Sequence, residues 1–140
     1  MRLVVPQSSD QNREFATWAA KELDVTFAEP FLAMAVVDAR PVIVGAVVLN
    51  NYDGHNIDLS GVGVGAFTPS IVRHLARYVF NERGCSCVTM KTKGSNKKTK
   101  KLLAKHFRYV GFLPKGYGQD DAVLYCATRE IGRASCRERV

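Results

Sequence analysis

Two consecutive apolar segments, each as long as a β-strand, constrain the fold more than any other feature of the sequence. They cover residues 31–37 (FLAMAVV) and 42–50 (VIVGAVVLN), and the turn-forming sequence Asp38-Ala39-Arg40-Pro41 separates them. Apolar runs of this length, bounded by turn residues, are typical of buried strands. Strands joined by so short a turn pair antiparallel, so we expect a buried antiparallel hairpin.

A second turn extends this hairpin. Residues 52–55 (YDGH) contain the pair Asp53-Gly54, which favours a tight turn because both central residues must take positive φ. The strand that follows is expected over residues 56–64. Together the three strands form an antiparallel meander, which is not how the parallel sheet of a nucleotide-binding fold begins.

Three segments have helical patterns. Asp10 is the expected N-cap of a helix over residues 11–23, whose apolar residues recur at helical spacing. Thr68-Pro69 begins a second helix, and Gly84 ends it. Asn96 opens a third, which is rich in lysine. Its expected inner face carries Thr99, Leu102, Leu103 and His106.

Three further strands are expected over residues 88–92, 107–113 and 121–127, with a turn at 115–118 between the last two. The order of elements is thus helix, three strands, helix, strand, helix and two strands. A single sheet with helices on its faces is the economical packing for this order. We therefore predict an α+β fold with one mixed, mostly antiparallel sheet and helices on both faces.

The composition agrees with one domain. The chain has 140 residues, of which 46% are apolar, and carries 20 Lys+Arg against 13 Asp+Glu. No apolar run approaches the roughly 18 residues that a membrane span needs, and residues 1–6 (MRLVVP) lack the pattern of a signal peptide. We expect a cytoplasmic protein that does not associate with membranes.

The segment 130–140 (EIGRASCRERV) differs from the rest of the chain. It carries no apolar periodicity and resembles the translation of a common sequencing-library adapter. We therefore expect a single domain over residues 1–129, followed by a non-native tail. A genuine basic tail is the alternative.

The cysteines indicate reduced thiols. Residues 1–129 contain Cys85, Cys87 and Cys126, a sparse and odd set. The sequence Cys85-Ser86-Cys87 could suggest zinc, but a structural zinc site needs about four ligands and no second Cys/His pair lies at the right spacing. We expect buried strand thiols at 85 and 87 and no metal site.

A glycine-rich segment joins the third strand to the second helix. Gly61, Gly63 and Gly65 are expected on one face of the strand and Val62 and Val64 on the other, because side chains alternate. One face would then be bare backbone, open to a flat or extended ligand. The helix that follows offers free N–H groups and a positive dipole end to a phosphate. A dinucleotide fingerprint does not fit, because G-x-G-x-G is not G-x-G-x-x-G; a bulge or close helix packing is the structural alternative.

Over residues 31–128 the chain resembles a small GNAT-type N-acetyltransferase. The matching pieces are the meander, the crossing Gly65-Ala66-Phe67-Thr68-Pro69, the strand at 87–91 (CVTMK), the helix 96–107 (NKKTKKLLAKHF), and the closing strands FRYVG and DDAVLY. In that family two neighbouring parallel strands splay. Acetyl-coenzyme A enters the gap, with its pyrophosphate on the loop before the central helix.

By this resemblance the loop that binds the pyrophosphate is residues 63–68. Asn96 matches the asparagine that helps hold the cofactor arm. The lysines near the start of the helix that Asn96 opens would contact the cofactor phosphates. The implied contacts with acetyl-CoA come from Gly61, Val62, Gly63, Gly65, Ala66, Phe67, Thr68, Asn96, Lys97 and Lys100.

The sequence departs from the family at three places. The loop signature R/Q-x-x-G-x-G/A lacks its basic first residue in the segment 60–66. Leu102-Leu103 stands where the family commonly has a tyrosine that protonates the leaving thiolate. His106-Phe107 stands where Gly-Phe is usual.

Because the usual tyrosine is missing, we select catalytic candidates by the ability of their side chains to accept or donate a proton. His55 or Asp58 could act as general base near the third strand, and Tyr109 could donate a proton. Each has a structural alternative: the hairpin turn for His55, a solvent-facing strand position for Asp58, and packing for Tyr109.

The predicted function is transfer of an acetyl group from acetyl-CoA to a primary amine. An inactive module with the same fold is one alternative. A nucleic-acid-binding protein is another, because residues 91–108 hold eight Lys/Arg and no carboxylate. Few aromatic residues interleave this run, which argues against the stacking surfaces of single-strand binders. The sequence pattern does not specify the acceptor or the oligomeric state.

Overall fold

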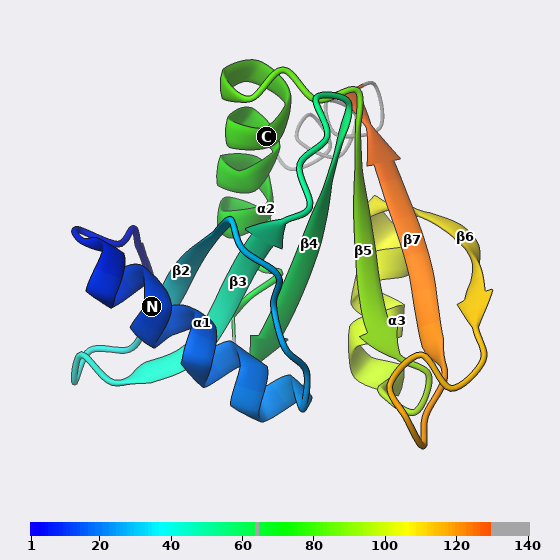
Figure 1. Ribbon diagram of the computed structural model, residues 1–140, viewed down its shortest axis with the longest axis horizontal. Coiled ribbons are helices and arrows are strands. Elements are labelled where there is room, and N and C mark those ends of the chain that lie inside the picture. Colours follow the sequence, from blue (N-terminus) through cyan, green and yellow to red (C-terminus); the bar gives the residue numbers. More distant parts are fainter. Residues whose placement is uncertain (64, 130–140) are drawn as a thin grey trace.

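Seven strands in the described part of the chain form one sheet, with the order β1-β2-β3-β4-β5-β7-β6 (Figure 1). The computed structural model describes residues 1–63 and 65–129. In chain order its elements are β1 (Arg2–Val4), α1 (Ser9–Leu23), β2 (Phe31–Val37), β3 (Ile43–Asn50), β4 (Asn56–Gly63), α2 (Pro69–Ala76), the π-helix η1 (Arg77–Glu82), β5 (Cys87–Lys93), α3 (Lys97–His106), β6 (Arg108–Leu113) and β7 (Ala122–Thr128).

The pairing within the sheet is antiparallel except between β4 and β5, which run parallel. Strands β2, β3 and β4 form the expected meander, in which Leu32 lies opposite Leu49 and Leu49 opposite Leu59. The prediction of an α+β fold with a mixed, mostly antiparallel sheet is confirmed.

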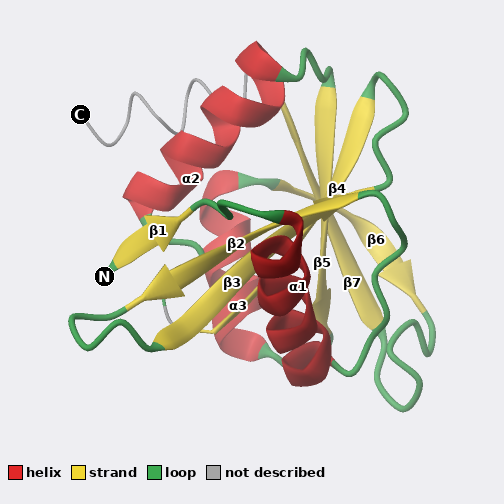
Figure 2. Ribbon diagram, turned by 60° about the vertical axis from the view of Figure 1, so that its left-hand side comes forward, coloured by secondary structure: helices red, strands yellow, loops and turns green. Residues whose placement is uncertain are grey.

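Helices cover both faces of the sheet (Figures 1 and 2), as predicted. Strict alternation along β2 and β3 divides their side chains between two cores. Met34, Val36, Val47 and Leu49 pack toward α2, η1 and α3. The opposite face is rich in alanine, and the small residues of β2 and β3 meet Ala16 and Ala19 of α1 closely. Both layers thus arise from the same two apolar runs.

Asn12 attaches α1 to the sheet. Strand β1 pairs only with the second half of β2, from Ala35 to Val37, so the first half has no strand neighbour on that side. The Asn12 side chain takes its place: Nδ2 donates to the Phe31 carbonyl at 2.9 Å, and Oδ1 accepts from the Ala33 amide at 2.7 Å. These two bonds satisfy backbone groups that would otherwise be left unpaired beside a helix.

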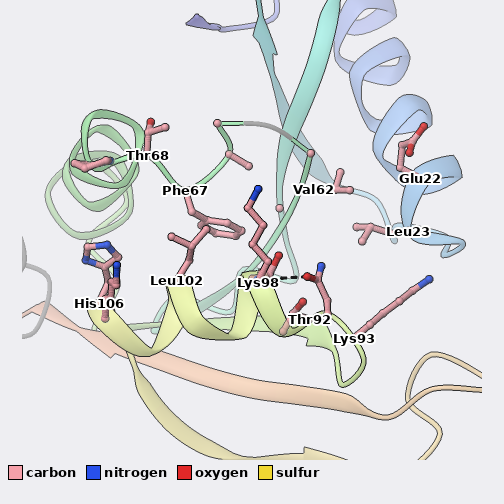
Figure 3. Close-up of a pocket in the computed structure, with 18 residues that line it drawn as sticks. Glu22, Leu23, Val62, Phe67, Thr68, Thr92, Lys93, Lys98, Leu102 and His106 are labelled. Carbon is pink, nitrogen blue, oxygen red and sulfur yellow. Dashed lines mark hydrogen bonds between the residues drawn. The ribbon is translucent and has the colours of Figure 1, made fainter.

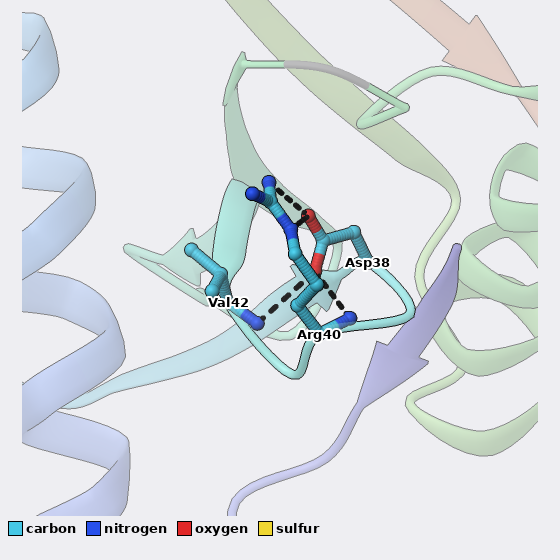
Figure 4. A network of polar contacts seen from close by, with 3 residues as sticks. All are labelled: Asp38, Arg40 and Val42. Carbon is cyan, nitrogen blue, oxygen red and sulfur yellow. Dashed lines mark hydrogen bonds and ion pairs between the residues drawn. The ribbon is translucent and has the colours of Figure 1, made fainter.

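The β2–β3 turn is organised by Asp38 (Figure 4). Its Oδ1 accepts from the amides of Arg40 at 2.8 Å and Val42 at 3.2 Å, and its Oδ2 pairs with the Arg40 guanidinium at 2.8 Å. The hydrogen bond from the Arg40 side chain, followed by that from its amide, lowers the pKa of Asp38 from its usual value. An aspartate that bonds the backbone two and four residues ahead fits the turn signal read from the sequence.

Several boundaries differ from the prediction. Ser8, not Asp10, caps α1: its Oγ accepts from the Gln11 amide at 3.1 Å, and Asp10 lies in the first turn. Strand β1 was not predicted, because three residues are too few to show periodicity. The π-helix η1 ends the second helix, where the Arg83 amide donates to the Tyr78 carbonyl five residues back.

The β3–β4 connection is also longer than the predicted two-residue hairpin. Positive φ occurs at Asn51 and Gly54 rather than at Asp53 and Gly54. Asp53 instead uses its carboxylate to accept from the amides of His55 and Asn56, which closes the turn from its side chain. Residue 64, the last of the predicted third strand, and the predicted tail 130–140 lie outside the described residues. Within the described part, no helix is long and apolar enough to cross a membrane.

Replacement of Asn12 by alanine is expected to lower the free energy of unfolding by about 1–3 kcal/mol, because it leaves a backbone donor and a backbone acceptor of β2 unpaired. Chemical denaturation measures the effect. Arg13→Ala, on the exposed side of the same helix, is the control and should change stability little. An equal loss in both variants would contradict the attachment role of Asn12.

Candidate functional site

The parallel pairing of β4 and β5 stops halfway along the strands. Four residue pairs join them, from Asn56 with Cys87 to Leu59 with Met90. Beyond these, β4 continues to pair with β3 up to Gly63, and β5 continues to pair with β7 up to Lys93. Each strand keeps its outer neighbour and loses its inner one, so the two diverge toward their C-terminal ends (Figure 1). The facing backbone edges there have no strand partner.

A cavity of about 570 Å³ occupies this divergence (Figure 3). Its walls come from β4, the loop after it, the end of β5, one face of α3 and the C-terminal end of α1. The lining residues are Glu22, Leu23, Gly61, Val62, Gly63, Gly65, Ala66, Phe67, Thr68, Pro69, Thr92, Lys93, Asn96, Lys98, Thr99, Leu102, Lys105 and His106. The cavity therefore reaches from the α2 and α3 side of the sheet to the α1 side.

The glycines of β4 line the cavity, but they do not form the bare, open face that strand alternation predicts. A Cβ on Gly61 would lie 2.5 Å from Cζ of Phe67, so the Phe67 ring packs directly on the Gly61 backbone and covers it. Gly63 has φ +87°, and a Cβ on it would lie 2.4 Å from the Val44 carbonyl oxygen. The regular alternation thus ends at Gly63, and the glycines do not form one open face. Phe67 becomes part of the cavity wall instead.

The N-terminus of α2 lies beside the cavity. The Thr68 amide donates to the Gly65 carbonyl at 3.3 Å, and the Thr68 side chain makes no capping bond. Pro69 has no N–H, and the first amides of a helix have no partner within it. The helix N-terminus with its positive dipole end therefore lies beside the cavity, lined by Thr68 and Pro69.

The other helix N-terminus at the cavity belongs to α3. Asn96 caps it, with Oδ1 accepting from the Thr99 amide at 3.1 Å. Its Nδ2 group is left to donate elsewhere. The preceding residue, Ser95, donates through both its amide and its hydroxyl to Asp120. The Ser95 hydroxyl lowers the pKa of Asp120 from its usual value, so an ionised carboxylate holds the turn that leads into α3.

The lysines of α3 divide between two surfaces. Lys98 and Lys105 line the cavity with Leu102, at the spacing i, i+4, i+7 of one helix face. Lys98 rises from the helix into the space between Phe67 and Val62 (Figure 3). Lys97 and Lys100, expected from the family resemblance, do not line this cavity, and Lys100 lies in a separate groove beside β6.

The three catalytic candidates are not brought together. His55 is exposed in the β3–β4 turn, at the end of β4 away from the cavity. Tyr109 is exposed on β6, with its ring at 6.0 Å from that of Tyr125 in an edge-to-face contact. Asp58 lies on β4, on the face opposite the buried Ile57 and Leu59. Its carboxylate accepts from the side-chain amides of Asn51 at 2.9 Å and Asn56 at 3.2 Å.

Sequence reasoning missed several lining residues. His106, expected at a helix end, is only 5% exposed, lines the cavity and lies edge-on to Phe107. Lys98 and Lys105 could have been found from their helical spacing to Leu102. Glu22 and Leu23 carried no signal, because they belong to the distant α1, and Thr92 and Lys93 lie at the far end of β5.

The thiols lie away from the cavity. Cys85 is fully buried. Cys87 donates from Sγ to Oδ1 of Asn56, which also accepts from the Thr89 hydroxyl at 2.9 Å. Burial raises the pKa of both thiols, which keeps them protonated at neutral pH. Across residues 1–63 and 65–129, no group of three or more His, Cys, Asp or Glu residues is arranged to hold a metal ion.

Solved structures of other proteins share the overall fold of this chain. No family model matches the sequence, and no curated protein matches it. A dodecameric spermidine N-acetyltransferase from Vibrio cholerae superimposes with a TM-score of 0.70 over 92% of this chain and 94% of its own, at 12% identity. A chimera of the Vibrio cholerae SpeG enzyme with hSSAT gives 0.68 over 95% and 99%, at 14% identity. This is the GNAT-type acetyltransferase fold. At such identities the likeness concerns the GNAT fold and leaves the activity to be argued from the site.

Gly61→Ala is expected to lower the free energy of unfolding by about 1–3 kcal/mol, because the new methyl group displaces the Phe67 ring. The double variant Gly61→Ala/Phe67→Leu, which shortens the opposing side chain, should recover part of the loss. Denaturation of the single and double variants measures this coupling. Additive losses would contradict direct packing of Phe67 on Gly61.

Proposed function

We propose that the protein is an N-acetyltransferase that uses acetyl-CoA and acetylates a primary amine. The observation that carries the proposal is the divergence of β4 from β5 over a cavity that reaches both faces of the sheet. Such a cavity allows two substrates to approach one point from opposite sides, which is what a transfer reaction needs. The proposal treats residues 1–129 as the catalytic domain.

The cavity wall fits a phosphate-bearing cofactor on the side of α2 and α3. The first-turn amides and the positive dipole end of α2 suit a pyrophosphate. Lys98 and Lys105 add positive charge on the facing wall, and Asn96 offers its Nδ2 donor. The unpaired backbone edges of β4 and β5 suit the amide groups of an extended pantetheine arm, which would bond to them as a strand does. We propose these groups, with the glycine loop, as the cofactor site.

When bound, acetyl-CoA supplies an acyl group activated as a thioester. The chain's own task is to hold the attacking amine close to that group and to stabilise the oxyanion that forms on the carbonyl. Backbone N–H groups on the free edge of β4, after Leu59, are the donors that we propose for the oxyanion. This role needs no particular side chain, which agrees with the small residues Ser60 and Gly61 at this point.

The incoming amine must lose a proton. Of the three candidates we retain Asp58 as the base, acting through water, because it lies on the strand that ends in the cavity and faces the α1 side. Asn51 and Asn56 donate to both of its oxygens and so orient the carboxylate. Leu102 lines the wall where the family tyrosine is expected. No tyrosine lines the cavity among the described residues, so we propose that the thiolate takes its proton from water.

An inactive cofactor-binding module is the second candidate. The absence of a tyrosine from the described cavity wall favours it, because the usual acid for the leaving thiolate is missing. Nucleic-acid binding has less support. Lys98 and Lys105 line the cavity while Lys100 lies in another groove, so the lysines of α3 are divided between two sites.

Acetyl-CoA is expected to raise the melting temperature of the protein, since it binds the folded state alone. With a primary amine such as spermidine or a lysine peptide present, chromatography should detect free CoA and the acetylated amine. A stabilising shift without product would favour the inactive module. If acetyl-CoA neither shifts the melting temperature nor yields product, the acetyltransferase proposal is refuted.

The double variant Lys98→Gln/Lys105→Gln should bind acetyl-CoA about tenfold more weakly, since it removes two charges that face the phosphates. Calorimetry measures the dissociation constant. Lys97→Gln/Lys101→Gln is the matched control, because it removes the same charge from lysines of the same helix that do not line the cavity. Equal weakening in both variants would show that only net charge matters.

A further inference from the structure

On the α1 side, the cavity has one negative wall and one positive wall. Glu22 lies in the last turn of α1, at the helix end where the dipole is negative. Lys93 ends β5 and lines the same cavity, and Figure 3 shows it extending toward the side of α1. Among the residues that the structure describes, neither side chain forms an ion pair, either with the other or with a third group. Both charges are therefore available to a ligand.

Strand pairing adds a second lysine to the positive wall. Met90 of β5 belongs to the core beneath α2 and α3, so Lys91 and Lys93 share the face toward α1 with Thr89. Thr89 lies opposite Asp58, the proposed base. Beyond that level the pairing with β4 stops, and the two lysines follow at steps of about 7 Å along the edge that borders the cavity. The base and the two ammonium groups thus lie along one face.

Tyr117 holds the two lysines near each other. Nζ of Lys91 lies 5.6 Å and Nζ of Lys93 lies 5.9 Å from the centroid of its ring, which is the range of a cation–π contact. The turn between β6 and β7 brings the ring there, because Gly116 lets this turn pack on Ala122: a Cβ on Gly116 would lie 2.5 Å from the Ala122 Cβ. Burial raises the pKa of the Tyr117 hydroxyl, so the ring supplies no negative charge at neutral pH.

Asp120 lies within electrostatic range of Lys93 but is engaged by another residue. The hydroxyl and the amide of Ser95 both donate to its carboxylate. The Ser95 hydroxyl is the main cause of the lowered pKa of Asp120, and the Lys93 charge adds to it. The positive wall therefore keeps charge for a ligand. A polyamine would bring further positive charge against Lys91 and Lys93, whereas an acceptor with an anionic group would pair with them.

We propose that the acceptor is an amine that also carries an anionic group, either a carboxylate or a phosphate. The proposal rests on the acetyltransferase function proposed above. Lys93, with Lys91 beside it, binds the anionic group, and Glu22 attracts the ammonium group as the acceptor enters. The transfer forms the C–N bond of the amide and breaks the C–S bond of the thioester. Of the two protons that the ammonium group loses, one ends on the sulfur of CoA and the other on water.

Amines with carbon chains of equal length test the proposal. Butylamine, putrescine and γ-aminobutyrate differ only in the group at one end, which is neutral, cationic or anionic. Ethanolamine and phosphoethanolamine form a second pair, which distinguishes a phosphate from a carboxylate. Release of free CoA by the full chain gives kcat/KM. We expect kcat/KM to be about tenfold higher for at least one anionic amine than for its neutral partner, and lowest for putrescine, because a charge-assisted hydrogen bond favours the anion.

Variants assign the preference to the positive wall. Lys93→Gln should lower kcat/KM for γ-aminobutyrate about tenfold relative to butylamine. Lys101→Gln is the matched control, because it removes the same charge from the groove beside β6, outside the cavity. Tyr117 is a positioning residue, so Tyr117→Leu should raise KM for γ-aminobutyrate more than it lowers kcat. Tyr117→Phe, which keeps the ring, should retain the parent KM. Circular dichroism checks that each variant is folded.

The outcomes separate this proposal from the acetyltransferase function. If the panel is acetylated but neither anionic amine exceeds its neutral partner, the acceptor class is wrong and the acetyltransferase stands. Equal loss of the preference in folded Lys93→Gln and Lys101→Gln would also overturn the role of the positive wall. If no amine of the panel yields product, both proposals fail together.

Discussion

Four backbone pairs between β4 and β5 hold the two halves of the sheet together, and the position at which this pairing stops determines the rest of the molecule. A parallel pair that continued to Gly63 and Lys93 would leave no cavity. The divergence is tolerated because each strand keeps its outer partner: β3 bonds β4 to its end, and β7 bonds β5 to its end. The free inner edges are then compensated only by water or by a ligand that can bond to them.

The elements beside this divergence are adapted to it. Phe67 packs on the bare backbone of Gly61 and so separates the apolar core from the cavity. The helices α2 and α3 both begin at its rim, which brings two positive dipole ends to one place. On α3, Leu103 is buried in the core, Lys98, Leu102 and Lys105 line the cavity, and the buried His106 also lines it. One helix therefore serves the core and the proposed cofactor site with adjacent faces.

The strands of the C-terminal half of the sheet have different neighbours on their two sides. β5 borders the cavity, β6 borders solvent, and β7 lies between them. Asp120 is placed between the two regions: it bonds Ser95 at the start of α3 and lines the groove beside β6. Strand β7 thus separates the cavity side of this half from its open edge.

Local chemistry was sufficient for most of the architecture. The apolar runs at 31–37 and 42–50, the Gly84 stop and the Asn96 cap correctly predicted the meander, the ends of two helices and the sheet class. The cap of α1 was misassigned, because Ser8 and Asp10 are both good caps and only the backbone decides which oxygen reaches an amide. The short β1 was missed, because its pairing with β2 is non-local.

The sequence by itself determined the helices and every strand except β1, because periodicity and turn residues act over a few positions. Only the tertiary structure decided what those elements do together. It covered Gly61 with Phe67, turned Lys98 rather than Lys97 and Lys100 toward the cavity, and left His55, Asp58 and Tyr109 in three separate places. Each of these depends on the rotation of a helix or the end of a strand pairing, which are set by contacts between residues far apart in the chain.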